Sequence, residues 1–281
     1  MKFLIFSRNP DARSYKRIIN EAENRKHKIL ITQTPDLDVS TDFSSSFYPY
    51  REFDLVHVLS GNKFLNQNLN RIFANMSIAV VNKNLSEFDT HSKLSQMSFY
   101  SNQGIPVPKT IYTMNPAWHK LTATLGADFV GKPINGSKGD GVVLIKSQKE
   151  LEKIEYPSQY IFQAHIINDG DYRVHVFGGE ACCLYKRVRK SGFVNNVSQG
   201  AVTEVVTNSL EIAQLVDLAK MTAQVGGFDY VGVDIVRSLV DGKLYVLETN
   251  SAPGMYDVQI DSGEDYAVKI IDFYEKMVLN K

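Results

Sequence analysis

Apolar and polar positions along residues 1 to about 85 predict an α/β lobe. Short apolar runs predict strands at residues 3–6, 28–32, 53–59 and 78–81. Polar stretches of helical length lie between them, from about residue 14 to 25 and from 63 to 74. Since a strand, a helix and a second strand in succession are typical of a parallel sheet, we expect one here.

Residues 86–168 have the pattern of a second lobe, of α+β type. Its first helix is predicted to start near Asp89 and to end before the glycine and prolines of residues 104–108. Two apolar strands follow, the first ending at Lys132 and the second covering residues 142–145. A glycine-rich loop joins these strands, so we expect a strand-loop-strand unit.

Residues 169–281 are predicted to form a third lobe built on two hairpins. Strands are predicted at residues 173–177, 180–188, 228–237 and 243–249, with a helix at about 209–225 between the hairpins. Gly178-Gly179 provides the turn of the first hairpin. Asp241-Gly242 lies in the second, and Asp-Gly between apolar alternations is the strongest short-range hairpin signal.

The second hairpin carries a candidate metal site. Asp234 and Glu248 lie seven residues on either side of position 241, which makes them near neighbours across the hairpin. Asn250 lies two residues beyond Glu248 and shares its face of the strand. Carboxylate and amide oxygens suit Mg²⁺ or Mn²⁺, and Mg²⁺ usually completes its shell with water and substrate phosphates. We therefore predict a metal site with a nucleotide as its partner; a loop-capping role before Pro253 is the alternative for Asn250.

The glycine-rich loop is a candidate phosphate site. It contains Gly136, Ser137, Gly139 and Gly141, directly after the strand that ends at Lys132. Glycines let backbone N–H groups approach phosphate oxygens, and Lys132 adds a positive charge beside them. The pattern is neither a Walker A motif nor a Rossmann fingerprint, because it does not open a helix. We interpret it as a phosphate-binding flap; ordinary hairpin glycines are the alternative.

Composition narrows the class of protein. The chain has 281 residues, is 43% hydrophobic, and has 31 basic and 31 acidic side chains. Such a balance gives no basic field for nucleic acid, and no run approaches the roughly 18 apolar residues of a membrane helix. Cys182 and Cys183 are adjacent on a predicted strand, which disfavours a mutual disulfide. These features favour a cytoplasmic protein with no membrane or nucleic-acid partner.

The motifs together resemble those of ATP-grasp ligases, above all the RimK-type amino-acid ligases and the related prokaryotic glutathione synthetases. The resemblance covers roughly residues 85 to 260 and depends on the order of its parts. These parts are Lys93, the Lys132 strand and its glycine loop, residues 162–166, 170–173 and 178–180, Arg187, Asn196, Asp234 and residues 248–254. It implies an ATP-grasp fold of mixed α/β and α+β type, with an N-terminal lobe, a central flap lobe and a C-terminal lobe that holds the metal.

The resemblance also implies a set of ATP contacts. Lys93 is expected to bind phosphate, although His91 stands where the family commonly has Asp. Adenine is expected on the linker formed by Gln163, Ala164, His165 and Ile166, through backbone groups and apolar packing. Ala164 replaces a frequent Glu and removes its side-chain contact. Asp171 resembles the acceptor of the ribose hydroxyls, and Asn196 resembles an Asn that binds phosphate or metal-bound water.

Arg187 is the expected catalytic residue, with Arg173 as a candidate second. A fixed guanidinium stabilises both an acyl-phosphate and the tetrahedral oxyanion formed when an amine attacks it. A strict two-residue turn at Gly178-Gly179 places the two arginines on opposite faces. Either the register slips or one arginine is structural, and the sequence leaves this open.

The activity implied is ATP-dependent ligation of a carboxylate to an amine, using ATP and one or two Mg²⁺ or Mn²⁺ ions. An amino acid and an acidic peptide are candidate substrates, and by analogy the protein is a homo-oligomer. A basic cluster (Lys186, Arg187, Arg189, Lys190) is either a solvated strand end or a wall that attracts an acidic substrate. Two alternatives remain on the same scaffold: a non-catalytic ATP-binding protein, and a kinase that stops at the acyl-phosphate.

Overall fold

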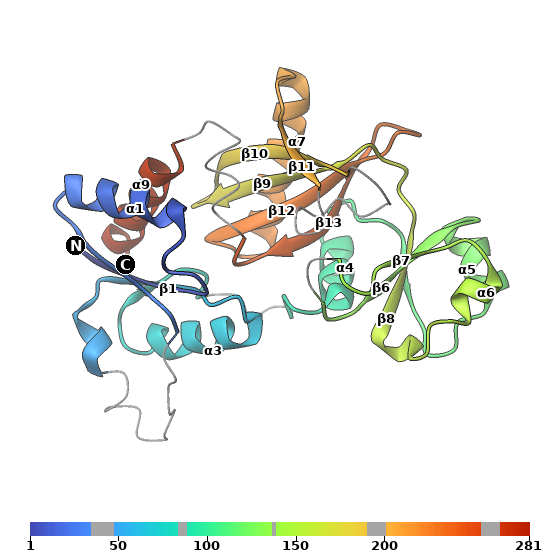
Figure 1. Ribbon diagram of the computed structural model, residues 1–281, viewed down its shortest axis with the longest axis horizontal. Coiled ribbons are helices and arrows are strands. Elements are labelled where there is room, and N and C mark those ends of the chain that lie inside the picture. Colours follow the sequence, from blue (N-terminus) through green and yellow to red (C-terminus); the bar gives the residue numbers. More distant parts are fainter. Residues whose placement is uncertain (35–47, 84–88, 137–138, 190–200, 254–264) are drawn as a thin grey trace.

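Three sheets organise the described part of the chain (Figure 1). This computed structural model describes residues 1–34, 48–83, 89–136, 139–189, 201–253 and 265–281. The sheets follow one another along the sequence, and the middle lobe lies at the opposite end of the molecule from the chain termini (Figure 1). Among these residues no helix has the length and apolarity needed to cross a membrane.

The N-terminal sheet is parallel, as predicted, with the order β2-β1-β3-β4. Its strands are β1 (Lys2–Ser7), β2 (Lys28–Thr32), β3 (Leu55–Leu59) and β4 (Ala79–Val80), and its helical elements are α1 (Arg13–Asn24), η1 (Tyr48–Glu52) and α3 (Lys63–Ala74). Successive residues of β1 point to opposite faces: Phe3 packs in the core with α1, and Leu4 packs in the core with α3. Both faces are therefore covered, which explains why β1 and β3 are mostly apolar.

The C-terminal helix α9 (Tyr266–Leu279) was not predicted, and it returns to the N-terminal sheet. Arg25, just after α1, donates to Asp272 of α9 at 2.5 Å and to Glu275 at 3.1 Å. The two chain termini consequently lie close together (Figure 1). One apolar core joins this helix, β1 and the hairpin of β9 (Asp171–Phe177) and β10 (Glu180–Val188), so the N-terminal lobe is anchored to the sheet that contains this hairpin.

The flap sheet is antiparallel and has the order β5-β8-β6-β7. Its elements are β5 (Thr110–Tyr112), α5 (Trp118–Leu125), β6 (Phe129–Pro133), β7 (Val143–Ile145), α6 (Gln148–Leu151), η2 (Pro157–Gln159) and β8 (Tyr160–Ala164). Phe129 and Phe162 pack against α5 on one face. Lys132 and Gln163 are of the opposite parity, so they lie on the other face. The predicted strand-loop-strand unit is β6–β7; β5, α5 and β8 as a strand were not predicted.

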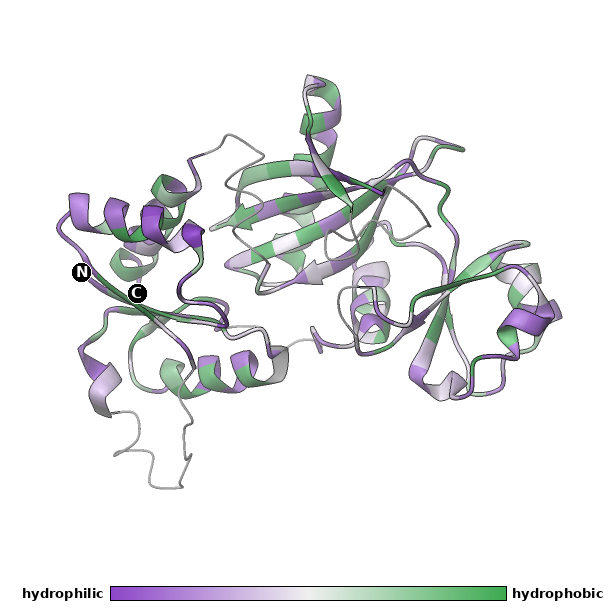
Figure 2. Ribbon diagram, viewed as in Figure 1, coloured by the Kyte–Doolittle hydropathy of each residue, from purple (hydrophilic) through white to green (hydrophobic). Residues whose placement is uncertain are grey.

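The central sheet has the order β11-β10-β9-β12-β13 and antiparallel pairing throughout. Its elements are β9 (Asp171–Phe177), β10 (Glu180–Val188), β11 (Val202–Val205), α7 (Ser209–Val225), β12 (Tyr230–Arg237) and β13 (Leu244–Asn250). Both predicted hairpins and the predicted helix are present. Helices α7 and α4 (Lys93–Asn102) cover one face of this sheet, and in strand β9 hydrophobic and hydrophilic residues alternate (Figure 2). The opposite face packs against the N-terminal core at one end, through Phe177 and Tyr230, and carries the charged side chains of Asp171, Arg173 and Asp234 further along.

Candidate functional site

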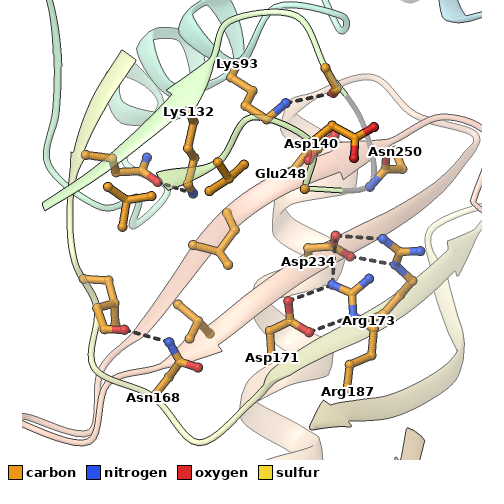
Figure 3. A pocket seen from close by; sticks show the side chains of 18 of the residues that line it. Lys93, Lys132, Asp140, Asn168, Asp171, Arg173, Arg187, Asp234, Glu248 and Asn250 are labelled. Atoms are coloured by element: carbon orange, nitrogen blue, oxygen red, sulfur yellow. Dashed lines mark hydrogen bonds and ion pairs between the residues drawn. The ribbon is translucent and has the colours of Figure 1, made fainter. Parts of the chain in front are cut away.

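A cavity of about 370 Å³ lies between the flap sheet and the polar face of the central sheet (Figure 3). Apart from Gly141, every predicted site residue in the described part of the chain lines it. These residues are Lys93, Lys132, Gly136, Gly139, Gln163, Ala164, His165, Ile166, Asp171, Arg173, Arg187, Asp234, Glu248 and Asn250. Ser137 and Asn196 lie outside the described residues. The structure thus brings together side chains that are more than 150 positions apart in sequence; their individual roles stay predictions.

The β12–β13 hairpin places Asp234 directly opposite Glu248, as its sequence predicted. The connection is longer than the expected turn at Asp241-Gly242, because β12 ends at Arg237 and β13 begins at Leu244. A β-bulge lies at Leu247, and without it Leu247 would face Asp234.

The same bulge determines which side chains of β13 reach the cavity. Leu247, Glu248 and Asn250 line it. Val246 and Thr249 are fully buried on the other face, where the Thr249 N–H donates to Gln96 of α4 at 2.8 Å. The bulge therefore lets two consecutive residues, Leu247 and Glu248, point into the pocket, which simple alternation does not allow.

A second bulge resolves the question of the two arginines. The β9–β10 pairing shifts by one residue between Ala181 and Cys183, so that Arg173 pairs with Tyr185 and Arg187 pairs with Asp171. Arg173 and Arg187 consequently lie on the same face, and the slipped register is the correct alternative. Both cysteines of this bulged segment are buried and free, as expected for adjacent residues on a strand.

The arginines form a charge cluster with Asp171 and Asp234, in which all members are buried except Arg173, which is partly exposed (Figure 3). Arg173 donates to both oxygens of Asp234 at 2.7 Å. Arg187 donates to both oxygens of Asp171 at 2.7 and 2.8 Å, and its Nη2 lies 3.0 Å from Asp234 Oδ2. Such bidentate pairs fix the guanidinium planes. Burial alone would raise the pKa of Asp234, but the two guanidinium groups more than offset it and hold that pKa well below its ordinary value.

The flap side of the cavity is basic. Lys132 donates to Gln163 Oε1 at 2.5 Å, and desolvation lowers the pKa of its ammonium group to about 8. Lys93 begins helix α4 and donates to the carbonyl of Gly136 in the loop at 2.9 Å. Both lysines therefore point toward the glycine loop or the cavity beneath it (Figure 3).

The loop itself needs glycine at two positions. Gly139 and Gly141 have φ of 78° and 70°, in the left-handed region that glycine tolerates best. A Cβ at Gly141 would also lie 2.8 Å from Pro133 Cγ. Gly141 thus shapes the return of the loop to β7 without lining the cavity.

The linker after β8 is held by its own contacts. The Ala164 N–H donates to the Lys109 carbonyl at 2.8 Å, so a backbone contact with adenine must come from the other linker groups. The ring of His165 bonds Asp128 at 3.0 Å. Gly170 lies so close to β10 that a Cβ would be 2.7 Å from the Arg187 carbonyl.

The basic cluster at the end of β10 contacts this linker. Lys186 pairs with Asp169 at 2.8 Å. Arg189 donates to the side-chain oxygen of Asn168 at 3.0 Å and to the backbone carbonyl of Asn168 at 2.8 Å. Lys186 and Arg189, like Arg187, therefore bind other groups of the protein. This argues against the interpretation that these three side chains form a wall that attracts an acidic substrate.

An apolar wall of the cavity was not predicted. It consists of Val130, Val142, Ile166, Val236 and Leu247, of which only Ile166 was a candidate. Two of the others were within reach of sequence reasoning, because Val130 lies two residues before Lys132 and Val236 lies two after Asp234. An apolar wall beside basic groups suits a flat aromatic ring that carries an anionic chain.

Comparisons with known proteins agree with this architecture. A family model for the RimK-like ATP-grasp domain matches residues 90–274. The chain belongs to the RimK-like ATP-grasp family. It is 30% identical to a probable alpha-L-glutamate ligase from Aeromonas salmonicida (strain A449), over 98% of this chain and 96% of the relative. A protein of the same name from Methanococcoides burtonii (strain DSM 6242 / NBRC 107633 / OCM 468 / ACE-M) is 29% identical, with the same coverage.

Solved structures confirm the ATP-grasp fold. The ATP-grasp ligase PsnB complexed with its minimal precursor gives a TM-score of 0.73 at 18% identity, covering 98% of both chains. D-alanine–D-alanine ligase from Bacillus anthracis gives 0.72 at 17% identity, covering 99% of this chain and 97% of the other. The family and fold expected from the motifs are therefore confirmed, and the RimK-like chain is a ligase by family.

Members of the ATP-grasp family use ATP and Mg²⁺, and the PsnB structures include a complex with Mg and ADP. Within the described ranges of this RimK-like chain, no group of three or more His, Cys, Asp or Glu side chains is placed to hold a metal. The predicted set contains two carboxylates and one amide, which is enough for Mg²⁺ when phosphates supply further oxygens. Asp234 Oδ1 accepts one hydrogen bond, from Arg173, and a carboxylate oxygen has room for a second contact. The residues present therefore fit a hard cation.

Proposed function

We propose that the protein is an ATP-dependent carboxylate-amine ligase that makes an amide bond through an acyl-phosphate. The observation that carries this proposal is the cavity that joins two unlike walls. One wall brings Lys93, Lys132 and the glycine loop, and the other brings two fixed arginines beside Asp234, Glu248 and Asn250. Triphosphate binding and stabilisation of an oxyanion require these two sets of groups in one place.

Adenine packs against the apolar wall, and Lys93 and Lys132 bind the phosphates beside the glycine-rich loop. An oxygen of the substrate carboxylate attacks the γ-phosphorus, and ADP leaves. The amine nitrogen then attacks the acyl carbon, phosphate leaves, and the nitrogen loses a proton. Arg187 stabilises the charge on the acyl oxygen in both steps, and its bidentate bond to Asp171 keeps its plane fixed. Asp234, Glu248 and Asn250 would hold one or two Mg²⁺ ions, which would neutralise phosphate charge.

The loop between β6 and β7 has a protective task in this reaction. An acyl-phosphate hydrolyses if water reaches it, so the cavity must be closed while it exists. The contact from Lys93 to the Gly136 carbonyl ties one end of the loop to α4. We expect this contact to guide the loop down over bound ATP.

Glutamate is the first amino-acid substrate to test, because the relatives at 29–30% identity are named probable alpha-L-glutamate ligases. The experiment measures ADP release with ATP and Mg²⁺ across amino acids and short acidic peptides, followed by mass spectrometry of the products. A ligation product has the summed mass of its substrates minus one water for each amide bond formed, and the absence of any such product counts against ligation. ADP release with a hydroxylamine-trapped acyl group and no amide would indicate a kinase instead.

A further inference from the structure

Lys132 is held by a neutral side chain on the neighbouring strand. β6 and β8 are antiparallel, with Lys132 opposite Ile161 and Val130 opposite Gln163, so Lys132 and Gln163 are diagonal neighbours on one face. The ammonium group donates to Gln163 Oε1 at 2.5 Å. Gln163 is 1% exposed, so its amide is enclosed in the flap sheet and cannot turn toward water for other partners.

A threonine fixes which end of that amide faces the lysine. Thr110 on β5 donates its hydroxyl proton to the Pro108 carbonyl at 2.7 Å. A hydroxyl has only one proton to donate, so Thr110 Oγ1 must accept in its other hydrogen bond. That bond comes from Gln163 Nε2 at 2.9 Å. The Gln163 NH₂ group is therefore directed at Thr110, and its oxygen is directed at Lys132.

We infer that Gln163 is the positioning residue of Lys132 and that Thr110 sets the orientation of the Gln163 amide. This inference rests on the proposed function, in which Lys132 binds phosphate. A neutral acceptor orients the ammonium group but leaves its charge to attract an anion, whereas a carboxylate at the same position would neutralise it. Gln163 is thus a polar group of the flap that serves Lys132 rather than adenine.

The chain offers matched variants for the hydrogen-bonded series of Thr110, Gln163 and Lys132, which we call the relay. Thr110→Val keeps the shape but removes both hydrogen bonds of the hydroxyl, while Thr110→Ser keeps the hydroxyl. Gln163→Glu replaces the neutral acceptor with a charged one of the same size. Thr122→Val is the control, because its hydroxyl bonds the Trp118 carbonyl within α5 and makes no contact with the relay.

The experiment measures the Kd of Mg–ATP by calorimetry and the KM values for ATP and for the amino acid. We expect Thr110→Val to weaken ATP binding about fivefold to tenfold, the size of one lost orienting hydrogen bond, and Gln163→Glu by more. KM for the amino acid should stay unchanged, and Thr110→Ser should restore ATP binding. Thr122→Val should match the unmodified protein.

The outcomes separate this inference from the proposed function. If the unmodified protein binds no Mg–ATP, the proposed function itself is wrong. If it binds Mg–ATP but Thr110→Val and Gln163→Glu bind equally well, only the positioning inference is overturned. A general folding defect would lower the melting temperature and the fraction of active protein without changing KM, and Thr110→Ser would then fail to separate from Thr110→Val, which also counts against the inference.

Discussion

The two walls of the cavity hold their cations in different ways. On the central sheet, Arg173 and Arg187 are bound by the carboxylates of Asp171 and Asp234 at 2.7–3.0 Å. On the flap, Lys132 donates to a neutral amide oxygen. A guanidinium between carboxylates is fixed and largely neutralised, whereas an ammonium group on an amide is oriented but keeps its charge.

This difference separates two tasks that one kind of cation performs poorly together. In the proposed reaction the flap attracts a polyanion, so its charge must stay available before the nucleotide arrives. The central sheet would present an arginine in one orientation to a short-lived oxyanion, so a fixed orientation matters more there than free charge. Breaking the charged pairs should therefore damage folding and catalysis together, while breaking the flap contact should affect nucleotide binding with little effect on folding.

Arg187→Ala should have the largest effect. It leaves Asp171 buried without its guanidinium partner, and breaking such a pair costs about 3–5 kcal/mol of unfolding free energy. Turnover should fall about 10²-fold to 10³-fold, because the group proposed to stabilise the oxyanion is gone. Urea unfolding and ADP release measure the two effects.

Arg17→Ala is the control for that variant, because Arg17 forms an exposed pair with Asp265 and such pairs contribute at most about 1 kcal/mol. The double variant Arg187→Met with Asp171→Leu should recover stability but not activity. Equal stability losses for Arg187→Ala and Arg17→Ala would show that the buried cluster does not hold the sheet as described.

Asp234→Asn tests the group that contacts both arginines. The amide keeps the shape but loses the charge, which leaves two largely buried cations with one carboxylate between them, at a cost of about 2–3 kcal/mol. Because Asp234 is a predicted metal ligand, the turnover of the variant should also fall by about 10²-fold or more. Magnesium titration of ADP release measures this, with Asp241→Asn in the exposed hairpin connection as control. Near-full activity at saturating Mg²⁺ would remove Asp234 from the metal site.

Lys132→Met should affect ATP binding strongly and the free energy of unfolding only slightly. Removing an ammonium group whose pKa is already lowered by desolvation relieves a cost of folding, which offsets the lost hydrogen bond to Gln163. We expect the unfolding free energy to change by less than about 1 kcal/mol, while ATP affinity falls about 10-fold to 100-fold. Calorimetry and urea unfolding on one preparation decide this. A stability loss as large as that of Arg187→Ala would erase the contrast between the walls.

The sequence predicted the local part of this site well. Period-two alternation and the Asp241-Gly242 signal placed Asp234 near Glu248, and the apolar runs on either side of the glycine-rich loop predicted the strand-loop-strand unit β6–β7. These features depend on residues close in the chain, where strand geometry constrains the outcome. Even so, Asp234 pairs with Glu248 only because of the bulge at Leu247; the register next to the connection would otherwise pair Asp234 with Leu247.

The nonlocal part was beyond the sequence. Arg173 and Asp234 are 61 residues apart, and no pattern in either strand states that β9 and β12 are neighbours. The one-residue shift near Cys182, which puts both arginines on one face, has no signal in a run of apolar residues. For the same reason the carboxylate partners of the arginines were not predicted, since Asp171 was assigned to ribose by resemblance. That role stays a prediction, with both Asp171 oxygens accepting from Arg187.

A pH titration should give the smallest effect and tests the flap alone. The pKa of Lys132 is lowered to about 8, so its ammonium group loses its proton as the pH rises from 7 to 9. If only the charged form holds phosphate, the Kd of ATP should rise about tenfold over this range, whereas arginines stay charged throughout. Lys132→Met provides the matched control, because its weaker binding should be flat from pH 7 to 9. A decline of the same steepness in that variant would assign the titration to another group and leave the charge of Lys132 without a part in binding.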